Sequence, residues 1–497
     1  MPSRASSLGA AAVLLGLVPV SSQEARPHDP PWQAFIAAAS AERHVSEAAL
    51  DVIAAGWRDG YSAMIVDVAR FLPAARRPRA ADDPLPPDLD DVVDERVGGG
   101  GRSSFPDAPR QPPGAETRRR LVDFLEGQTG KRFGDDLRAW RRWMWSLPYA
   151  PHPDYSTFKA EAYARVDPRF RLFFPPRVPA SIRLDEIDWG GVAVNGIPPL
   201  RSPRTVPAAA AADWLRPGHI VFGVIVNGEA RAYPKRILAW HELAIDRLGG
   251  VDLAIVYCTL CGTVIPYESA AGGRRFTFGT SGLLYRSNKL MFDEETRSLW
   301  SSLEGVPVVG PLVASGLQLR FHPVVTTTWS EWRRDHPSTT VLSLETGYER
   351  NYSEGAAYRD YFASDRLMFE VPRADTRLAN KAEVLVLRPE IAGKGVPPVA
   401  IAVDRLRRVP VYAFDIQGHR FVVVTSKEGA NLMYESGSHA FVPRLVDGEI
   451  RDTTGQRWTP TPDALVGERG ERLARVPAHR AFWFGWVAQH PDTVLHK

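Results

Sequence analysis

The sequence predicts an α+β protein, in which a helical N-terminal region is followed by two tandem β-rich repeats of antiparallel strands and hairpins. Near the N-terminus, Ala, Leu and Ile recur at helical spacing. From about residue 182 onward, short apolar runs are separated by Gly, Pro and Asn, and Asn227-Gly228 in "HIVFGVIVNGEARAYP" predicts a hairpin turn. Several motifs then recur in the same order further along the chain, which indicates a duplication.

Composition and charge narrow the class of protein. The chain has 497 residues, enough for several domains, and its 44% hydrophobic and 24% charged residues are ordinary for a globular protein. Its net charge is +3, from 61 basic and 58 acidic residues. No overall field therefore favours nucleic acid or an anionic membrane, and we expect no nucleic-acid partner.

The first 22 residues resemble a secretory signal peptide. Arg4 precedes an apolar run from about Leu8 to Val20, and small residues, Val20 and Ser22, stand before the expected cleavage point. The run is too short to span a bilayer comfortably. We therefore expect an exported protein, periplasmic or secreted, with no membrane span after signal cleavage.

The predicted organisation follows the chain in order. After the signal peptide (1–22) come a helical segment (23–73), a flexible linker rich in Pro, Asp, Arg and Gly (74–117), a second helical segment (118–181), repeat one (182–345), a connection (346–379) and repeat two (380–497). The sequence assigns no role to the helical segments.

The two repeats share a scaffold but differ in reactive residues. "YES" occurs at residues 267–269 and 434–436, and the frame Trp-x-x-Trp-x-x-x-His-Pro begins at Trp329 and again at Trp483. Repeat two has no counterpart of Cys258, Cys261 or His241, and it lacks most of "FGTSGLLYRSNKLMF". Residues present only in repeat one are candidates for chemistry, so we expect the functional site there.

The two cysteines of the chain form a Cys-x-x-Cys-Gly motif between the predicted strands "VDLAIVY" and "TVIPYES". A disulfide closing so tight a loop would stabilise the fold little. A thioredoxin-type pair opens a helix, whereas a strand–turn–strand corner is typical of a metal knuckle. Cys258, Cys261 and His241 are the predicted ligands of copper or zinc, and His322 is a weaker candidate.

Two other functions fit the same motif. One is a thiol–disulfide oxidoreductase with Cys258 as the attacking thiol; the other is a non-catalytic, ligand-binding envelope protein in which a disulfide shapes a loop. For the metal site and for both alternatives, residues 279–288 are expected to form a loop over the site. Four polar side chains in this segment are candidates to orient a small molecule: Ser281, Tyr285, Arg286 and Asn288. Whether the protein is an enzyme stays open, as does any protein partner.

The motifs together resemble a known bacterial family. "ARAYP", "WHELAID", "VYCTLCGT", "FGTSGLLYRSNKLMFDEETRSLWS" and "TTW" occur in this order over about residues 217–342, and the chain is similar there to the domain of unknown function 3179. The second repeat resembles a degenerate continuation. The resemblance implies no activity, substrate or cofactor, but it suggests that His241, Cys258, Cys261 and the segment 279–288 belong together.

Overall fold

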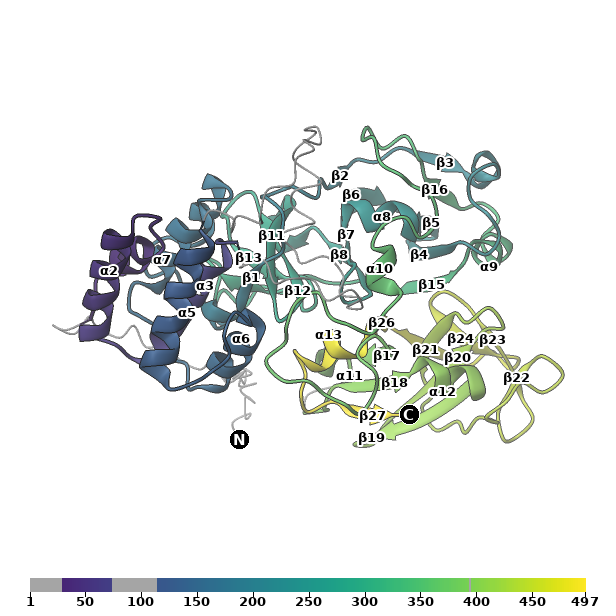
Figure 1. The fold of residues 1–497 in the computed structure, drawn as a ribbon. Helices are drawn as coiled ribbons and strands as arrows, with labels where there is room; N and C mark the ends of the chain where they lie inside the picture. The colour runs from purple at the N-terminus through teal and green to yellow at the C-terminus, as the bar shows by residue number, and fades with distance from the viewer. Residues whose placement is uncertain (1–28, 74–113, 393–394) are drawn as a thin grey trace, which may run out of the picture.

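The computed structural model describes residues 29–73, 114–392 and 395–497 (Figure 1). The predicted signal peptide and most of the predicted linker lie outside the described residues. Within them the α+β class is confirmed, with helices first and two β-rich repeats after them. None of the helices in the described ranges is long and apolar enough to cross a membrane.

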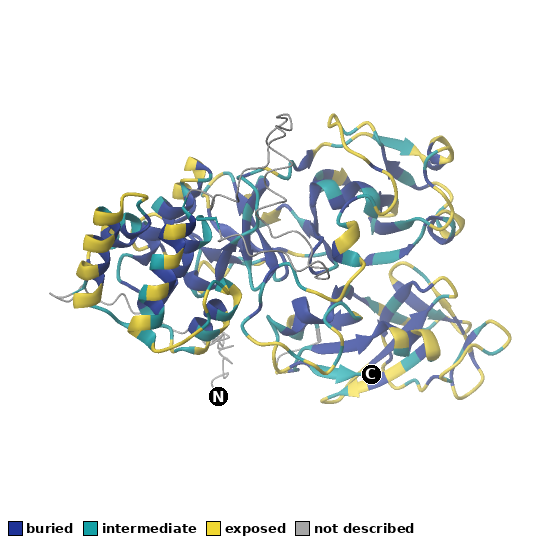
Figure 2. Cartoon of the chain, in the orientation of Figure 1, coloured by how far each residue is buried: buried dark blue, intermediate teal, exposed yellow. Residues whose placement is uncertain are grey.

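In the described part of the N-terminal region, on the left of Figure 1, there are six α-helices. They are α1 (Trp32–Ala38), α2 (Arg43–Ala55), α3 (Ser62–Arg70), α5 (Ala115–Thr129), α6 (Leu137–Ser146) and α7 (Tyr155–Tyr163). Apolar spacing explains their packing: α2, for example, buries Ser46, Ala49, Leu50 and Ile53 on one face. Figure 2 shows the exposed residues of these helices on their outer side.

A five-stranded antiparallel sheet connects the helices to the repeats. Its order is β1 (Ile187–Trp189), β11 (Phe278–Tyr285), β12 (Asn288–Asp293), β13 (Leu299–Ser301) and β14 (Pro307–Val309). Leu283, Leu290 and Phe292 pack with the helices, while Met291 and Trp300 pack in a core to which both repeats contribute. Both faces of this sheet are therefore buried.

The segment 279–288 is consequently not the loop that the sequence predicts. It lies in β11, the turn at residues 286–287 and the start of β12. Because the sheet is buried on both faces, its strands lack the alternation of polar and apolar residues that would have marked them. The segment that repeat two lacks thus serves as the surface on which the helical region packs.

Repeat one has two further sheets. One has the order β15 (Val324–Thr328), β4 (Ile220–Val226), β5 (Glu229–Pro234), β16 (Thr340–Leu342) and β3 (Thr205–Pro207), and the other has the order β2 (Leu200–Arg201), β6 (Leu243–Leu248), β7 (Val251–Cys258) and β8 (Thr263–Glu268). Helices α8 (Lys235–His241) and α9 (Trp329–Asp335) and the small hairpin β9 (Ala270–Ala271) and β10 (Arg274–Arg275) complete it. Asn227 and Gly228 adopt positive φ at the tip of the β4–β5 hairpin, as predicted.

Repeat two follows the same plan. Its first sheet has the order β26 (His479–Phe482), β17 (Glu383–Leu387), β18 (Val399–Ala402) and β27 (Val494–His496). Its second has the order β19 (Val411–Ile416), β20 (His419–Thr425), β21 (Asn431–Glu435), β25 (Arg472–Val476), β24 (Ala464–Gly467), β23 (Arg457–Pro460) and β22 (Ile450–Arg451). The helices are α11 (Pro389–Ala392), α12 (Val403–Arg408) and α13 (Trp483–Val487), while α10 (Arg359–Phe362) lies in the connection between the repeats.

The duplication is visible in both pairing and hydrogen bonds. The last strand of each repeat pairs in parallel with the second strand of its first hairpin, β16 with β5 and β27 with β18. In the closing segments, Trp332 Nε1 donates to Thr339 Oγ1 at 2.9 Å and Trp486 Nε1 donates to Thr493 Oγ1 at 2.9 Å. Similar composition alone would not produce two buried hydrogen bonds with the same donor, acceptor and spacing. The closing segments of the two repeats therefore share one local fold.

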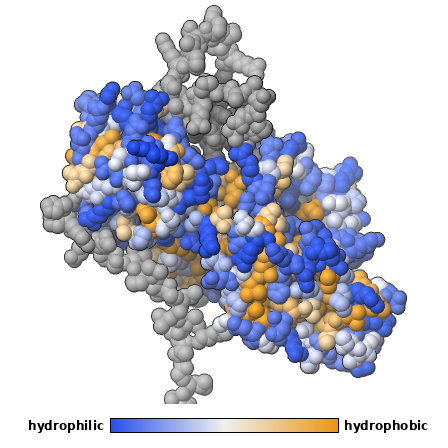
Figure 3. All heavy atoms as spheres, turned by 60° about the horizontal axis from the view of Figure 1, so that its bottom comes forward, coloured by the Kyte–Doolittle hydropathy of each residue, from blue (hydrophilic) through white to orange (hydrophobic). Residues whose placement is uncertain are grey.

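Few large apolar side chains are exposed on this fold. Among the described residues they are Val52, Leu172, Tyr348 and Leu445. The face shown in Figure 3 is accordingly mostly hydrophilic, with smaller hydrophobic areas.

Candidate functional site: a buried dithiol

The two cysteines lie at a tight turn between β7 and β8, as the sequence predicts. Cys258 is the last residue of β7, and the Cys261 amide donates to the Cys258 carbonyl at 3.2 Å. Gly262 follows with φ +63°, and a Cβ there would come within 3.1 Å of the Phe482 ring from repeat two. Glycine is therefore required both by the backbone and by the close approach of the second repeat.

The two sulfur atoms are close together and shielded from solvent. Cys258 Sγ and Cys261 Sγ lie 2.9 Å apart without a disulfide between them. Cys258 is 2% exposed and Cys261 is 0% exposed. Cys261 Sγ also lies 3.2 Å from the Ser287 carbonyl oxygen, which can accept its proton in a hydrogen bond. The arrangement brings the thiols close enough for a bond between them to form after a small movement.

The surroundings of the two thiols are unequal. Burial opposes ionisation of Cys258. Two hydrogen bonds, one with the Cys261 side chain and one with the Lys289 backbone amide, outweigh the effect of burial and lower the pKa of Cys258. Burial, the same hydrogen bond and the charge of the Cys258 thiolate raise the pKa of Cys261 well above its ordinary value. Cys258 is thus the thiol that ionises first, and Cys261 holds its proton.

A buried lysine and glutamate accompany the thiols. Lys289 Nζ donates to the Glu242 carbonyl at 2.6 Å and lies 3.7 Å from Glu242 Oε2. Burial lowers the pKa of Lys289, and burial raises the pKa of Glu242 although Lys289 opposes that change. The Lys289 ammonium favours the Cys258 thiolate as well. Neither residue is among the site residues predicted from the sequence; the signal for Lys289 is a lysine inside the apolar run "NKLMF".

The connecting segment (residues 346–379) covers this cluster with three tyrosines. The Tyr361 hydroxyl donates to the Leu260 carbonyl at 2.7 Å, inside the Cys-x-x-Cys turn. The Tyr358 hydroxyl donates to Glu242 Oε1 at 3.1 Å. The third, Tyr352, places its hydroxyl 2.6 Å from an imidazole nitrogen of His241. Access to the sulfurs therefore depends on this segment.

His241, the predicted third ligand, lies beside the connecting segment. It ends α8 and is fully buried, with Nδ1 2.8 Å from the Pro198 carbonyl and Nε2 2.6 Å from the Tyr352 hydroxyl. Burial lowers its pKa. Both ring nitrogens are thus hydrogen-bonded to other groups. His322, the weaker candidate, places Nε2 2.9 Å from Glu268 Oε1. Nowhere in the described residues do three or more His, Cys, Asp or Glu side chains form a group that could hold a metal.

The four polar residues expected to orient a ligand have separate positions. Ser281 is buried in β11, where its hydroxyl donates to the Leu290 carbonyl at 2.5 Å. Arg286 Nε donates to Glu186 Oε2 at 2.5 Å, and burial together with Glu186 raises the pKa of Tyr285.

Of the four, Asn288 is the one that joins the sulfur cluster to repeat two. Its Nδ2 donates to the Gly485 carbonyl at 2.9 Å, and a Cβ added at Gly485 would lie 2.9 Å from Cys261 Cβ. Asn288 is also next in sequence to Lys289 and to Ser287, whose carbonyl contacts Cys261. The second repeat therefore forms one wall of the site, although it supplies no sulfur.

Comparison with known proteins places the chain in a family. No curated protein and no solved structure matches it. A family model does match, and the match extends through both repeats, which is further than the similarity predicted from the motifs alone. The matched residues, 194–493, make up well over half of the chain. The chain therefore belongs to the family described as "Protein of unknown function (DUF3179)".

Proposed function

We propose that Cys258 and Cys261 form a redox-active dithiol that exchanges two electrons with a thiol or disulfide partner. The observation that carries the proposal is the pair of unbonded sulfurs 2.9 Å apart with opposite shifts of their pKa values. A thiolate is the nucleophile in thiol–disulfide exchange, and a neighbouring thiol resolves the mixed disulfide.

The proposed exchange has two steps. The Cys258 thiolate attacks one sulfur of a substrate disulfide, so that a Cys258–substrate bond forms, the substrate disulfide breaks and the leaving thiolate takes a proton. Cys261 then loses its proton and attacks Cys258 Sγ, which releases the second substrate sulfur as a thiol. In total the protein loses two electrons and the Cys261 proton, and the substrate gains two electrons and two protons; the second proton comes from solvent, because the Cys258 thiolate is already deprotonated.

The lysine fits this sequence of steps. The Lys289 ammonium offsets the negative charge of the Cys258 thiolate before attack. Once the thiolate has reacted, the Glu242 carboxylate, which also neighbours Lys289, can balance the charge of the ammonium. Export, which we expect from the N-terminal residues, would put the dithiol where disulfides persist.

The proposal is tested with oxidised glutathione and two matched serine variants. Wild type is expected to form an internal disulfide, seen by mass spectrometry after alkylation. Cys261→Ser is expected to stop at a mixed disulfide on Cys258, and Cys258→Ser is expected to form neither product at a comparable rate. Equal reactivity of the two variants, or thiols that stay reduced, would contradict the proposal.

The prediction of copper or zinc is tested on the same preparations. Elemental analysis of protein purified without a metal-affinity tag measures metal per chain. About one copper or zinc per chain in wild type, lost in Cys258→Ser, would favour a metal site over the dithiol.

A further inference from the structure

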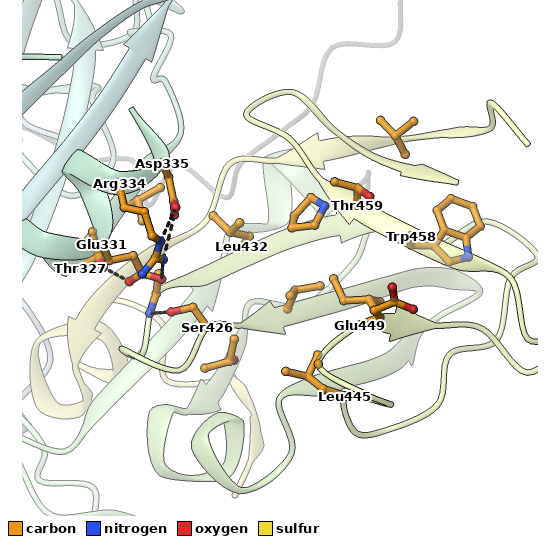
Figure 4. Close-up of a pocket in the computed structure, with 18 of the residues that line it drawn as sticks. Thr327, Glu331, Arg334, Asp335, Ser426, Leu432, Leu445, Glu449, Trp458 and Thr459 are labelled. Atoms are coloured by element: carbon orange, nitrogen blue, oxygen red, sulfur yellow. Dashed lines mark hydrogen bonds and ion pairs between the residues drawn. The ribbon is translucent and has the colours of Figure 1, made fainter. Parts of the chain in front are cut away.

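A large cleft separates the two repeats, away from the cysteines. It has a volume of about 1390 Å³ and is lined by residues 318–323 and 335–338 of repeat one and by residues 459–463, Arg475 and Pro477 of repeat two. A neighbouring cavity of about 780 Å³ shares several of its lining residues. Figure 4 shows the neighbouring cavity, with Glu331, Arg334 and Asp335 on one side and Leu432, Trp458 and Thr459 on strands of repeat two. Clefts between domains are common places for ligands.

Among the described residues, the charged side chains that line the cleft form ion pairs, and Arg475 is the exception. The three carboxylates that line it each have an arginine partner: Asp335 with Arg334, Glu390 with Arg388 and Asp463 with Arg472. Arg320, also in the lining, pairs with Glu268 at 3.3 Å. Within the part of the chain that the structure describes, Arg475 has no carboxylate partner; its guanidinium lies over the Tyr434 ring, 5.4 Å from the centroid, and its Nε is buried without a hydrogen bond.

Comparison of the repeats shows a different residue at the position of this arginine. Tyr267 pairs with Phe321 in repeat one, and the equivalent Tyr434 pairs with Arg475 in repeat two. Phe321 and Arg475 therefore occupy equivalent positions, and both line the same cleft. An apolar ring fills this position in one copy, whereas in the other copy a guanidinium lies over the Tyr434 ring, 5.4 Å from its centroid, at the lining of the cleft.

A histidine of the cleft differs between the copies in a similar way. His490 in repeat two places Nε2 2.9 Å from Glu304 Oε1. Its counterpart His336 lines the cleft, where its ring lies 4.2 Å from that of Trp332, and burial lowers its pKa. Among the described residues His336 makes no such ion pair, so a neutral imidazole is available to a ligand in the cleft.

We infer that the cleft between the repeats binds a small molecule carrying a carboxylate or phosphate, with the Arg475 guanidinium as its anchor. A planar guanidinium offers two parallel N–H donors to either oxyanion. The proline and aliphatic side chains of the cleft, such as Pro323 and Ile391, provide apolar surface for the remainder of the molecule. This site is independent of the dithiol.

The test uses the full chain with inorganic phosphate and, separately, succinate as probes, each compared with chloride at equal ionic strength. Calorimetric titration gives the Kd, and the thermal midpoint should rise with probe concentration as mass action requires. Arg475→Phe, which installs the residue of repeat one, is expected to weaken binding about tenfold or more. Arg407→Gln removes one charge from the exposed side of α12 and is expected to leave the Kd unchanged.

The outcomes separate clearly. Saturable binding of phosphate alone, or of succinate alone, supports the site and identifies the anion class. Binding that survives in Arg475→Phe, or no effect of either probe beyond that of chloride, would overturn it. Circular dichroism and the thermal midpoint in chloride check that Arg475→Phe folds.

Discussion

Replacement of Tyr361 by Phe should open the dithiol to solvent more often. The Tyr361 hydroxyl donates to the buried Leu260 carbonyl at 2.7 Å, within the turn that carries both cysteines. Loss of such a hydrogen bond costs about 0.5–1.5 kcal/mol. We assume that the sulfurs react only when the connecting segment moves away from them. A loss of about 0.5–1.5 kcal/mol from the closed state then raises the population of the open state about 2- to 13-fold at 25 °C.

The assay is the rate of thiol modification by a small disulfide reagent under native conditions, with the unfolded protein as the upper limit. Tyr348→Phe is the matched control, because Tyr348 lies in the same segment but is 42% exposed. We expect Tyr361→Phe to react about 2- to 13-fold faster than wild type and Tyr348→Phe to react at the wild-type rate. Equal rates for wild type and Tyr361→Phe, or wild-type thiols that react as fast as in the unfolded chain, would refute the reasoning.

Three further predictions follow from the described contacts. Lys289→Met should raise the pKa of the attacking thiol, because the ammonium favours the thiolate; the pH dependence of alkylation measures this, and an unchanged profile would contradict it. Thr339→Val and Thr493→Val should each cost about 1–3 kcal/mol of unfolding free energy, because each leaves a buried indole N–H without a partner, and denaturant unfolding should give similar values for both. Burial alone would raise the pKa of Glu304, but its hydrogen bond with His490 lowers the pKa below the unfolded value of about 4.3. The stabilisation of the fold by the Glu304 carboxylate is therefore present above about pH 4.3 and is lost as the pH falls through the folded pKa. His490→Gln should flatten this acid limb, and an unchanged limb would argue against the pair.

The general fold could be predicted because its signals are local. Helical spacing near the N-terminus, the Asn227-Gly228 turn and the repeated Trp-x-x-Trp frame each depend on neighbouring residues, and the structure bears them out. The strand structure of residues 279–288 could not be predicted in the same way. Leu283 packs with the helices, and Leu284 packs with the cysteine turn, the connecting segment and repeat two, so most of these contacts are distant in sequence.

The site was predictable in part for the same reason. The cysteine turn is a local feature, and comparison of the repeats directs attention to Cys258, Cys261 and His241. The environment of the sulfurs depends on residues far along the chain: Lys289 on β12 and Tyr361 in the connecting segment. Sequence spacing makes His241 the predicted third ligand, and this stays a prediction; the Pro198 carbonyl and the Tyr352 hydroxyl, to which its ring nitrogens are hydrogen-bonded, are identified by no local pattern.

The most direct measurement of the central claim is a redox titration of the purified protein in mixtures of reduced and oxidised dithiothreitol, followed by alkylation and mass spectrometry. We expect Cys258 and Cys261 to be oxidised together in a single reversible two-electron transition, with a tenfold change in equilibrium constant for about 30 mV. Thiols that remain free at every potential, or a disulfide that does not reduce without unfolding, would contradict the assignment of a redox-active dithiol.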